Sequence, residues 1–202
     1  MKESTVIAIS REYGSGGREL SQILAKKLGW RLYDRQIVSQ AAEKLGVGDM
    51  DFEKLKKFEE EVPPLPLSFT PFYLFGVKES PHSLNDKMFE TESEAIRRLA
   101  EDAPCILLGR CADYVLRDRP DTYSFYICAD DAFRAKRGKE TYEGRTLSDL
   151  NAEDLKRGGY YSHYTNRKWG DPKYYNLSIN TGICSLEQAA GLIVHYIESV
   201  QA

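Results

Sequence analysis

"VIAISREYGSGGRELSQILAKKLGW", residues 6–30, is the stretch of sequence that decides the fold. Its first four residues form a short, wholly apolar run, which is typical of a parallel strand buried on both faces. A polar segment with three glycines follows, and then leucine and isoleucine recur at helical spacing until Gly29, a residue suited to end a helix. The stretch therefore predicts a strand, a glycine-rich loop and a helix in succession.

The glycine loop, residues 12–17, stands where open α/β sheets bind ligands, beyond the carboxyl end of a strand. Backbone N–H groups and the positive end of a helix dipole attract phosphate at such a place. Gly14, Gly16 and Gly17 would let the main chain approach an anion without interference from a Cβ atom, and Ser15 adds a small hydroxyl. A tight turn without a ligand is the alternative, but three glycines favour phosphate binding.

Two classes of phosphate loop differ in their spacing. The dinucleotide fingerprint, G-x-G-x-x-G with an acid about 20 residues further on, matches Gly14, Gly16 and Asp34, but Glu19 takes the place of its third glycine. The mononucleotide loop, G-x-x-x-x-G-K-[ST], needs a lysine where this chain has Gly17 or, in the other register, Arg18. Arg18 would stand at the head of the helix and can contact phosphate through two N–H groups, so we predict that it replaces the lysine.

Short apolar runs alternate with helical patterns along the rest of the chain. The runs short enough to be buried strands are residues 105–109, 123–129 and 177–180. Thr91 and Ser185 each begin a capping-box pattern, which predicts that a helix starts at each of them. The alternation predicts a single α/β domain over residues 1–202, with a mostly parallel sheet and helices on both faces.

Residues 59–90 are expected to form an insertion of irregular structure. Five prolines fall within residues 62–81, and proline removes backbone donors and clashes inside a helix or a central strand. The insertion also carries more aromatic residues than a solvated linker would. It is therefore expected to pack on the core, on a second subunit in a homodimer or on a substrate.

Basic residues are concentrated between residues 134 and 168, where nine lysines and arginines stand with five acidic residues. This segment is +4 in a chain whose formal net charge is −3. A run of this kind is either a solvated face or a lid that closes on a phosphate ligand. After a glycine loop, the lid is the better interpretation, and two glycines after Arg157 would give it a hinge.

The overall charge and hydropathy limit the partners. A net charge of −3 argues against nucleic-acid binding, which needs a basic excess. No apolar run approaches the ~18 residues of a membrane span, and no apolar leader precedes the first strand. A cytoplasmic protein without a membrane partner is expected.

Four segments, in this order, resemble the cytidylate kinase-like proteins, which are relatives of the nucleoside monophosphate kinases. The segments are "ISREYGSGGRELSQILAKKLGWRLYDRQIV" (9–38), "CILLGRCADYVL" (105–116), "YYSHYT" (160–165) and "WGDPKYYNLSIN" (169–180). The resemblance covers nearly the whole chain outside the insertion. It implies a P-loop NTPase-type sheet with strand order 2-3-1-4-5, an arginine-rich lid, and transfer of the γ-phosphoryl group of ATP to a nucleoside monophosphate such as CMP or dCMP.

The resemblance also implies the cofactors ATP and Mg²⁺ and a set of site residues. The glycine loop and helix head would bind ATP through Gly14, Ser15, Gly16, Gly17, Arg18 and Glu19, with Glu19 as a candidate magnesium ligand. The lid arginines, which together with Arg18 would be the catalytic residues, are Arg134, Arg137 and Arg157. The acceptor would be bound by Asp34, Arg35 and Arg110. Cytidylate kinases have an aspartate where this chain has Cys111 and a serine where it has Arg35, which weakens the case for cytosine as the base.

The implied reaction suits the composition. An acceptor that is a phosphate monoester has a second pKa of about 6 and arrives mostly ionised, so no general base is required. The chain has only three histidines, which agrees with such a reaction. Two alternatives stay open: a nucleotide-binding regulatory protein that lost catalysis with its lysine, and a dinucleotide-binding oxidoreductase.

Overall fold

The computed structural model describes residues 1–34 and 81–202, and within them the chain forms a five-stranded, all-parallel sheet. The strands are β1 (Val6–Arg11), β2 (Arg31–Tyr33), β3 (Cys105–Leu108), β4 (Thr122–Cys128) and β5 (Leu177–Asn180). Their order across the sheet is β2-β3-β1-β4-β5. The predicted order 2-3-1-4-5 is therefore confirmed.

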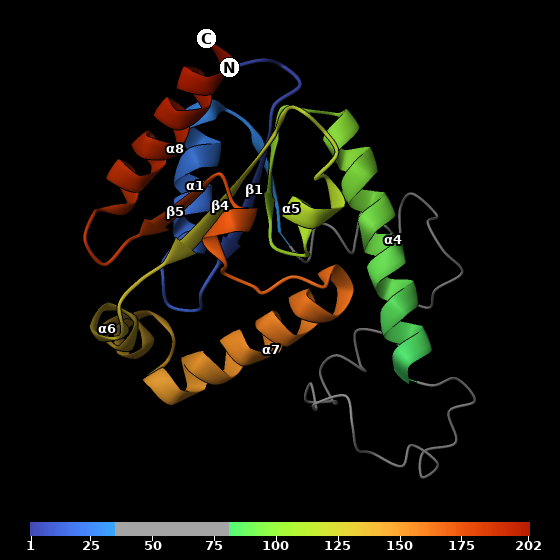
Figure 1. Cartoon of the computed structure of the whole chain (residues 1–202). Helices are drawn as coiled ribbons and strands as arrows, with labels where there is room; N and C mark the ends of the chain where they lie inside the picture. The colour runs from blue at the N-terminus through green and yellow to red at the C-terminus, as the bar shows by residue number, and fades with distance from the viewer. Residues whose placement is uncertain (35–80) are drawn as a thin grey trace.

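Helices cover both faces of this sheet (Figure 1). They are α1 (Gly17–Leu28), α4 (Pro81–Glu101), α5 (Ala112–Val115), α6 (Asp131–Thr141), α7 (Leu147–Thr165) and α8 (Leu186–Gln201), with a 3₁₀ turn at Pro172–Tyr174. Figure 1 shows α1 and α8 on one face, α4 and α5 on the other, and α6 and α7 across one end of the sheet. No helix in the described part of the chain is long and apolar enough to span a membrane.

The central strand β1 belongs to two hydrophobic clusters at once. Val6 and Ala8 pack with residues of α4 and α5, whereas Ile7 and Ile9 pack with residues of α1 and α8. All four side chains are at most 1% exposed. Because successive side chains of a strand point to opposite faces, a continuous apolar run is what a strand between two helical layers requires.

The register of β1 places its last residues beyond the end of the neighbouring strand β3. Ile9 pairs with Leu108, the last residue of β3, while Arg11 pairs with Ile127 of β4. β1 therefore extends beyond β3, and the glycine loop and Arg11 lie at the carboxyl edge of the sheet, where open α/β sheets bind ligands.

Most predicted elements are confirmed, and three details are corrected. Gly29 ends α1 in the left-handed conformation (φ 71°), and Ser185 begins α8 with a complete capping box. Thr91, however, lies inside α4, which begins ten residues earlier at Pro81, so residues 81–90 of the predicted insertion are helical. Proline is tolerated there because the first turn of a helix lacks acceptors for its N–H groups.

The third correction concerns the hinge predicted after Arg157. Gly158 and Gly159 lie within the uninterrupted helix α7, so they provide no break in the chain. The remainder of the insertion, residues 59–80, lies outside the described residues, as does the expected packing of that segment.

The capping box of α8 gives a first test of the fold. The Ser185 hydroxyl accepts from the Gln188 N–H at 3.1 Å, and the Gln188 side chain accepts from the Ser185 N–H at 2.9 Å. We expect Ser185→Ala to lower the free energy of unfolding by about 1 kcal/mol in urea titration, because it leaves helix-end donors unsatisfied. Ser199→Ala, on the exposed side of the same helix, should change it by less than about 0.5 kcal/mol. Equal effects of the two substitutions would contradict the capping role.

Candidate functional site

The glycine loop has a fixed conformation between β1 and α1. Gly14 and Gly16 have φ values of 84° and 81°, in the left-handed region that favours glycine. Ser15 is fully buried, and its hydroxyl donates to the Glu12 carbonyl at 2.8 Å. The Thr181 hydroxyl, beyond the end of β5, donates to the Ser15 carbonyl at 2.5 Å. These contacts hold the loop in one shape.

The loop glycines also have a packing role, which the sequence did not indicate. A Cβ atom on Gly14 would lie 3.0 Å from the Leu150 side chain of α7, and one on Gly16 would lie 3.0 Å from the Leu186 side chain of α8. Glycine is therefore needed there for close packing of the two helices as well as for the backbone angles. The N–H groups of Gly14 and Gly16 have no hydrogen-bond acceptor within residues 1–34 and 81–202. These amides are what the loop offers to an anion.

Arg11 crosses the head of α1, and sequence reasoning missed it. A Cβ atom on Gly17 would lie only 2.5 Å from the Cβ and 2.9 Å from the Cγ of Arg11. A Cβ atom on Gly109, directly after β3, would collide with the Arg11 guanidinium. The Arg11 side chain thus runs from β1 through the space left by one glycine towards the space left by the other. Two features of the sequence could have indicated this. Arg11 follows the apolar strand run, and Gly17 stands where a phosphate loop normally has lysine.

Three other arginines lie close enough to Arg11 to affect its pKa. Burial lowers the pKa of Arg11, and the neighbouring guanidinium groups of Arg157, Arg110 and Arg18 lower it further, to about 9. Asp154 opposes this shift only in part. Within the described residues the Arg11 guanidinium has no hydrogen bond or ion pair, yet with this pKa it stays a cation at neutral pH.

The turn after β3 is strained. Gly109, Arg110 and Cys111 have successive φ values of 79°, 55° and 55°. A left-handed conformation costs a residue other than glycine about 1–3 kcal/mol, and such strain gathers at functional sites. Arg110 lies at the carboxyl edge as predicted, but its guanidinium is in a buried ion pair with Glu92 of α4, another residue that sequence reasoning missed.

Asp154 of α7 ties the lid helices to the glycine loop. Its carboxylate accepts from the Tyr13 N–H at 2.8 Å and from the Arg134 guanidinium at 2.5 Å. Arg134 also donates to the Tyr13 carbonyl at 2.9 Å. Arg157 is held more loosely, with one nitrogen 3.4 Å from Asp154 and 3.3 Å from the Arg11 carbonyl. Two predicted lid arginines therefore lie at the loop, and a carboxylate absent from the prediction positions them.

The third lid arginine also lies at the loop. Arg137 pairs with Glu19 at 2.5 Å, and its guanidinium carbon is 3.7 Å from where a Cβ atom on Gly16 would be. The second carboxylate oxygen of Glu19, Oε2, is buried and has no hydrogen-bond partner among the residues that the structure describes. The structure thus brings together two of the predicted site residues, Arg137 and Glu19.

Arg18 lies farther out than predicted. Its side chain is 65% exposed and pairs with Asp34 at 3.4 Å, so a predicted loop residue and a predicted acceptor residue contact each other. Its replacement of the loop lysine stays a prediction. Arg35, the other predicted acceptor residue, lies outside the described residues.

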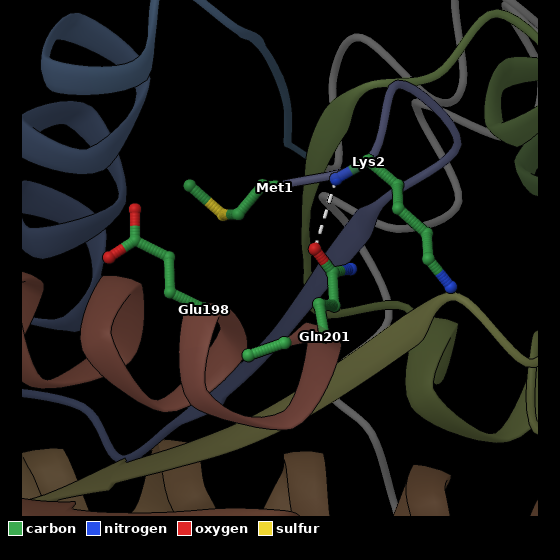
Figure 2. A pocket seen from close by; sticks show the side chains of 5 residues that line it. Met1, Lys2, Glu198 and Gln201 are labelled. Atoms are coloured by element: carbon green, nitrogen blue, oxygen red, sulfur yellow. Dashed lines mark hydrogen bonds between the residues drawn. The ribbon is translucent and has the colours of Figure 1, made fainter.

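Two surface hollows lie at the opposite end of the sheet. One is lined by Met1, Lys2, Glu198, Gln201 and Ala202, as Figure 2 shows, and the Lys2 N–H donates to the Gln201 side chain across it at 2.9 Å. The other is lined by Gly29, Trp30, Arg31, Asp102 and Pro104. Both lie beside the residues that begin the strands, whereas the glycine loop and the arginines lie where β1 ends.

The sheet order and the loop at the head of α1 define an α/β fold of the P-loop NTPase type, and comparisons with known proteins narrow this class. Residues 6–183 match the model of the cytidylate kinase-like family. The chain belongs to this family. No curated protein matches the sequence.

Solved structures share the fold. An uncharacterized protein from Eubacterium ventriosum is 27% identical, with a TM-score of 0.72 over 98% of this chain and 99% of that one. A gluconokinase from Sinorhizobium meliloti is 13% identical, with a TM-score of 0.57 over 99% and 95% of the two chains. A shikimate kinase from Acinetobacter baumannii is 12% identical, with a TM-score of 0.52 over 96% and 93%. At the latter two identities the likeness concerns the fold alone.

The Asp154 contacts give a second test. We expect Asp154→Ala to lower the free energy of unfolding by about 3 kcal/mol or more, because it leaves the buried Arg134 without its main partner. Asp131→Ala is the matched control: Asp131 pairs with the same arginine at 3.8 Å but is 73% exposed, so its loss should cost at most about 1 kcal/mol. Urea titration of both variants measures the difference. Similar losses would show that Asp154 is not the anchor.

Proposed function

We propose that the protein is an ATP-dependent kinase that transfers the γ-phosphoryl group to a nucleoside monophosphate, such as CMP or dCMP, or to a related small phosphate acceptor. The observation that carries the proposal is the glycine loop, in which the Gly14 and Gly16 amides have no acceptor among the described residues and around which arginines from three elements lie. Arg11 comes from β1, Arg137 from α6 and Arg157 from α7. Membership of the cytidylate kinase-like family supports it.

The residues fit the needs of phosphoryl transfer. This reaction asks a protein for positioning and for positive charge around the transferring group, with little covalent chemistry. In the proposal, the loop amides and the head of α1 hold the phosphates of ATP, and Arg137 and Arg157 balance the charge that develops. Arg134 positions the loop through Tyr13. Asp34, Arg35 and Arg110 remain the proposed acceptor residues.

A magnesium ion fits beside Glu19. Mg²⁺ prefers oxygen ligands and is usually bound by one or two carboxylates together with phosphates and water. The buried Oε2 of Glu19 would supply one such oxygen, while Oε1 stays with Arg137. The described residues contain no cluster of three potential metal ligands, and in the proposal ATP and water would supply the other ligands. Such an ion would neutralise charge on the phosphates.

A regulatory nucleotide-binding protein is the second candidate. Arg134 and Arg137 are paired with Asp154 and Glu19, and this pairing opposes their use on a phosphate. A kinase would have to exchange these carboxylates for the phosphates of ATP, whereas a protein that only binds a nucleotide would not. The oxidoreductase alternative loses its support, because the strand order differs from the 3-2-1-4-5-6 order of dinucleotide-binding folds.

Release of ADP tests the kinase directly. With ATP and magnesium, we expect folded protein to release ADP in a coupled assay when CMP, dCMP, UMP or AMP is added, with different rates for the four acceptors. Calorimetry with ATP under the same conditions should show binding. ATP binding without ADP release for all four acceptors would favour the regulatory protein. If the protein neither binds ATP nor releases ADP, nucleotide binding itself is contradicted.

A further inference from the structure

We propose that Arg11 supplies the cation that a phosphate loop normally takes from a lysine at the position of Gly17. In this arrangement, a guanidinium from the end of the first strand binds the phosphate held by the loop. The inference deepens the proposed function and rests on it, because it names the residue that makes a loop without lysine competent.

The positions of Arg11 and Gly17 are sterically linked. Any side chain at position 17 would begin 2.5 Å from the Cβ of Arg11, closer than two unbonded carbon atoms can approach. The neighbour that would have to move is the base of the Arg11 side chain, which is fixed by the strand, and not its flexible end. In this geometry the chain can therefore carry a side chain at position 17 or at position 11, but not at both.

Gly109 extends the same path. Its φ of 79° lies in the region that favours glycine, and a Cβ atom there would collide with the guanidinium of Arg11. Two glycines from separate elements thus leave room for one arginine, which takes its charged end to the carboxyl edge of the sheet. There the loop amides that have no acceptor among the described residues lie on the same edge.

Arg11 differs from the other arginines of the site in lacking a carboxylate partner. Arg18 pairs with Asp34, Arg137 with Glu19, and both Arg134 and Arg157 with Asp154. No ion pair joins Arg11 to an acid in the part of the chain that the structure describes. A partly buried cation without an ion pair destabilises a folded protein unless an anion joins it. A phosphate, whose oxygens match the fork of a guanidinium, satisfies that requirement.

The test uses the full chain, with inorganic tripolyphosphate and magnesium-ATP as probes. Arg11→Met removes the charge and keeps much of the apolar stem. We expect it to weaken the binding of both probes, measured by calorimetry, by about 10- to 100-fold. We also expect it to raise the melting temperature of the protein without ligand, because an unpaired charge disappears. A structural role for Arg11 would instead lower that temperature.

The controls separate Arg11 from its neighbours. Arg117→Met, in the exposed turn before β4, should leave binding and melting temperature unchanged. If Arg18→Met abolishes tripolyphosphate binding and Arg11→Met does not, the proposal is overturned. It is also overturned if Arg11→Met binds both probes as tightly as the unchanged protein.

Exchanging the two positions tests the steric link. We expect Gly17→Lys alone to lower the melting temperature, because its side chain meets that of Arg11. The double variant Arg11→Gly with Gly17→Lys should fold, and it should bind tripolyphosphate at least about 10-fold more tightly than Arg11→Gly alone. Full stability of Gly17→Lys, or no gain in the double variant, would refute the link. If Arg11→Met does not fold, the double variant still tests whether a cation at position 11 or 17 binds the phosphate.

These outcomes separate the inference from the kinase proposal. Loss of tripolyphosphate binding in Arg11→Met, in a protein that transfers no phosphoryl group, would support Arg11 and contradict the kinase. Undiminished ADP release by Arg11→Met would support the kinase and contradict Arg11. Failure of the unchanged protein to bind either probe would contradict both.

Discussion

The burial of β1 on both faces is the constraint on which the rest of the structure depends. Because Val6 and Ala8 are covered by one helical layer and Ile7 and Ile9 by the other, the strand can neither slip nor rotate. A slip of one residue would exchange the two sets of side chains between the layers. Its pairing with β3 and β4 then decides which residues extend past the sheet edge. The positions of Arg11, the glycine loop and the head of α1 follow from that register.

Much of the fold could be predicted because its signals are local. The apolar run at residues 177–180 and the capping box at Ser185 depend on neighbouring residues only, and both are confirmed. The predicted start of α4 at Thr91 was wrong because the local signal there was misleading. Its first turns carry a proline and polar residues, while the Thr91 pattern inside the helix matches a cap by coincidence. A local pattern cannot tell a first turn from a middle one when both are polar.

The candidate site was less predictable because its geometry depends on contacts between distant residues. The sequence indicated the glycine loop and the arginine-rich segment, and the structure brings them together. It could not indicate that Asp154 would bond the amide of Tyr13, because 141 residues separate the two. The reason for glycine at position 17 also depends on a distant contact. The phosphate-loop motif suggested only that a lysine is missing there, whereas the structure shows that the Arg11 side chain fills the space a side chain at position 17 would need.

The crossing of Arg11 over Gly17 has a consequence for descent. Two positions that compete for one space must change as a pair, so relatives with this loop should show correlated substitutions at them. If Arg11 is the loop cation as proposed, a single substitution at either position leaves the site overcrowded or without that cation. In the proposed arrangement, the loop cation can pass from position 11 to position 17 only when both residues change.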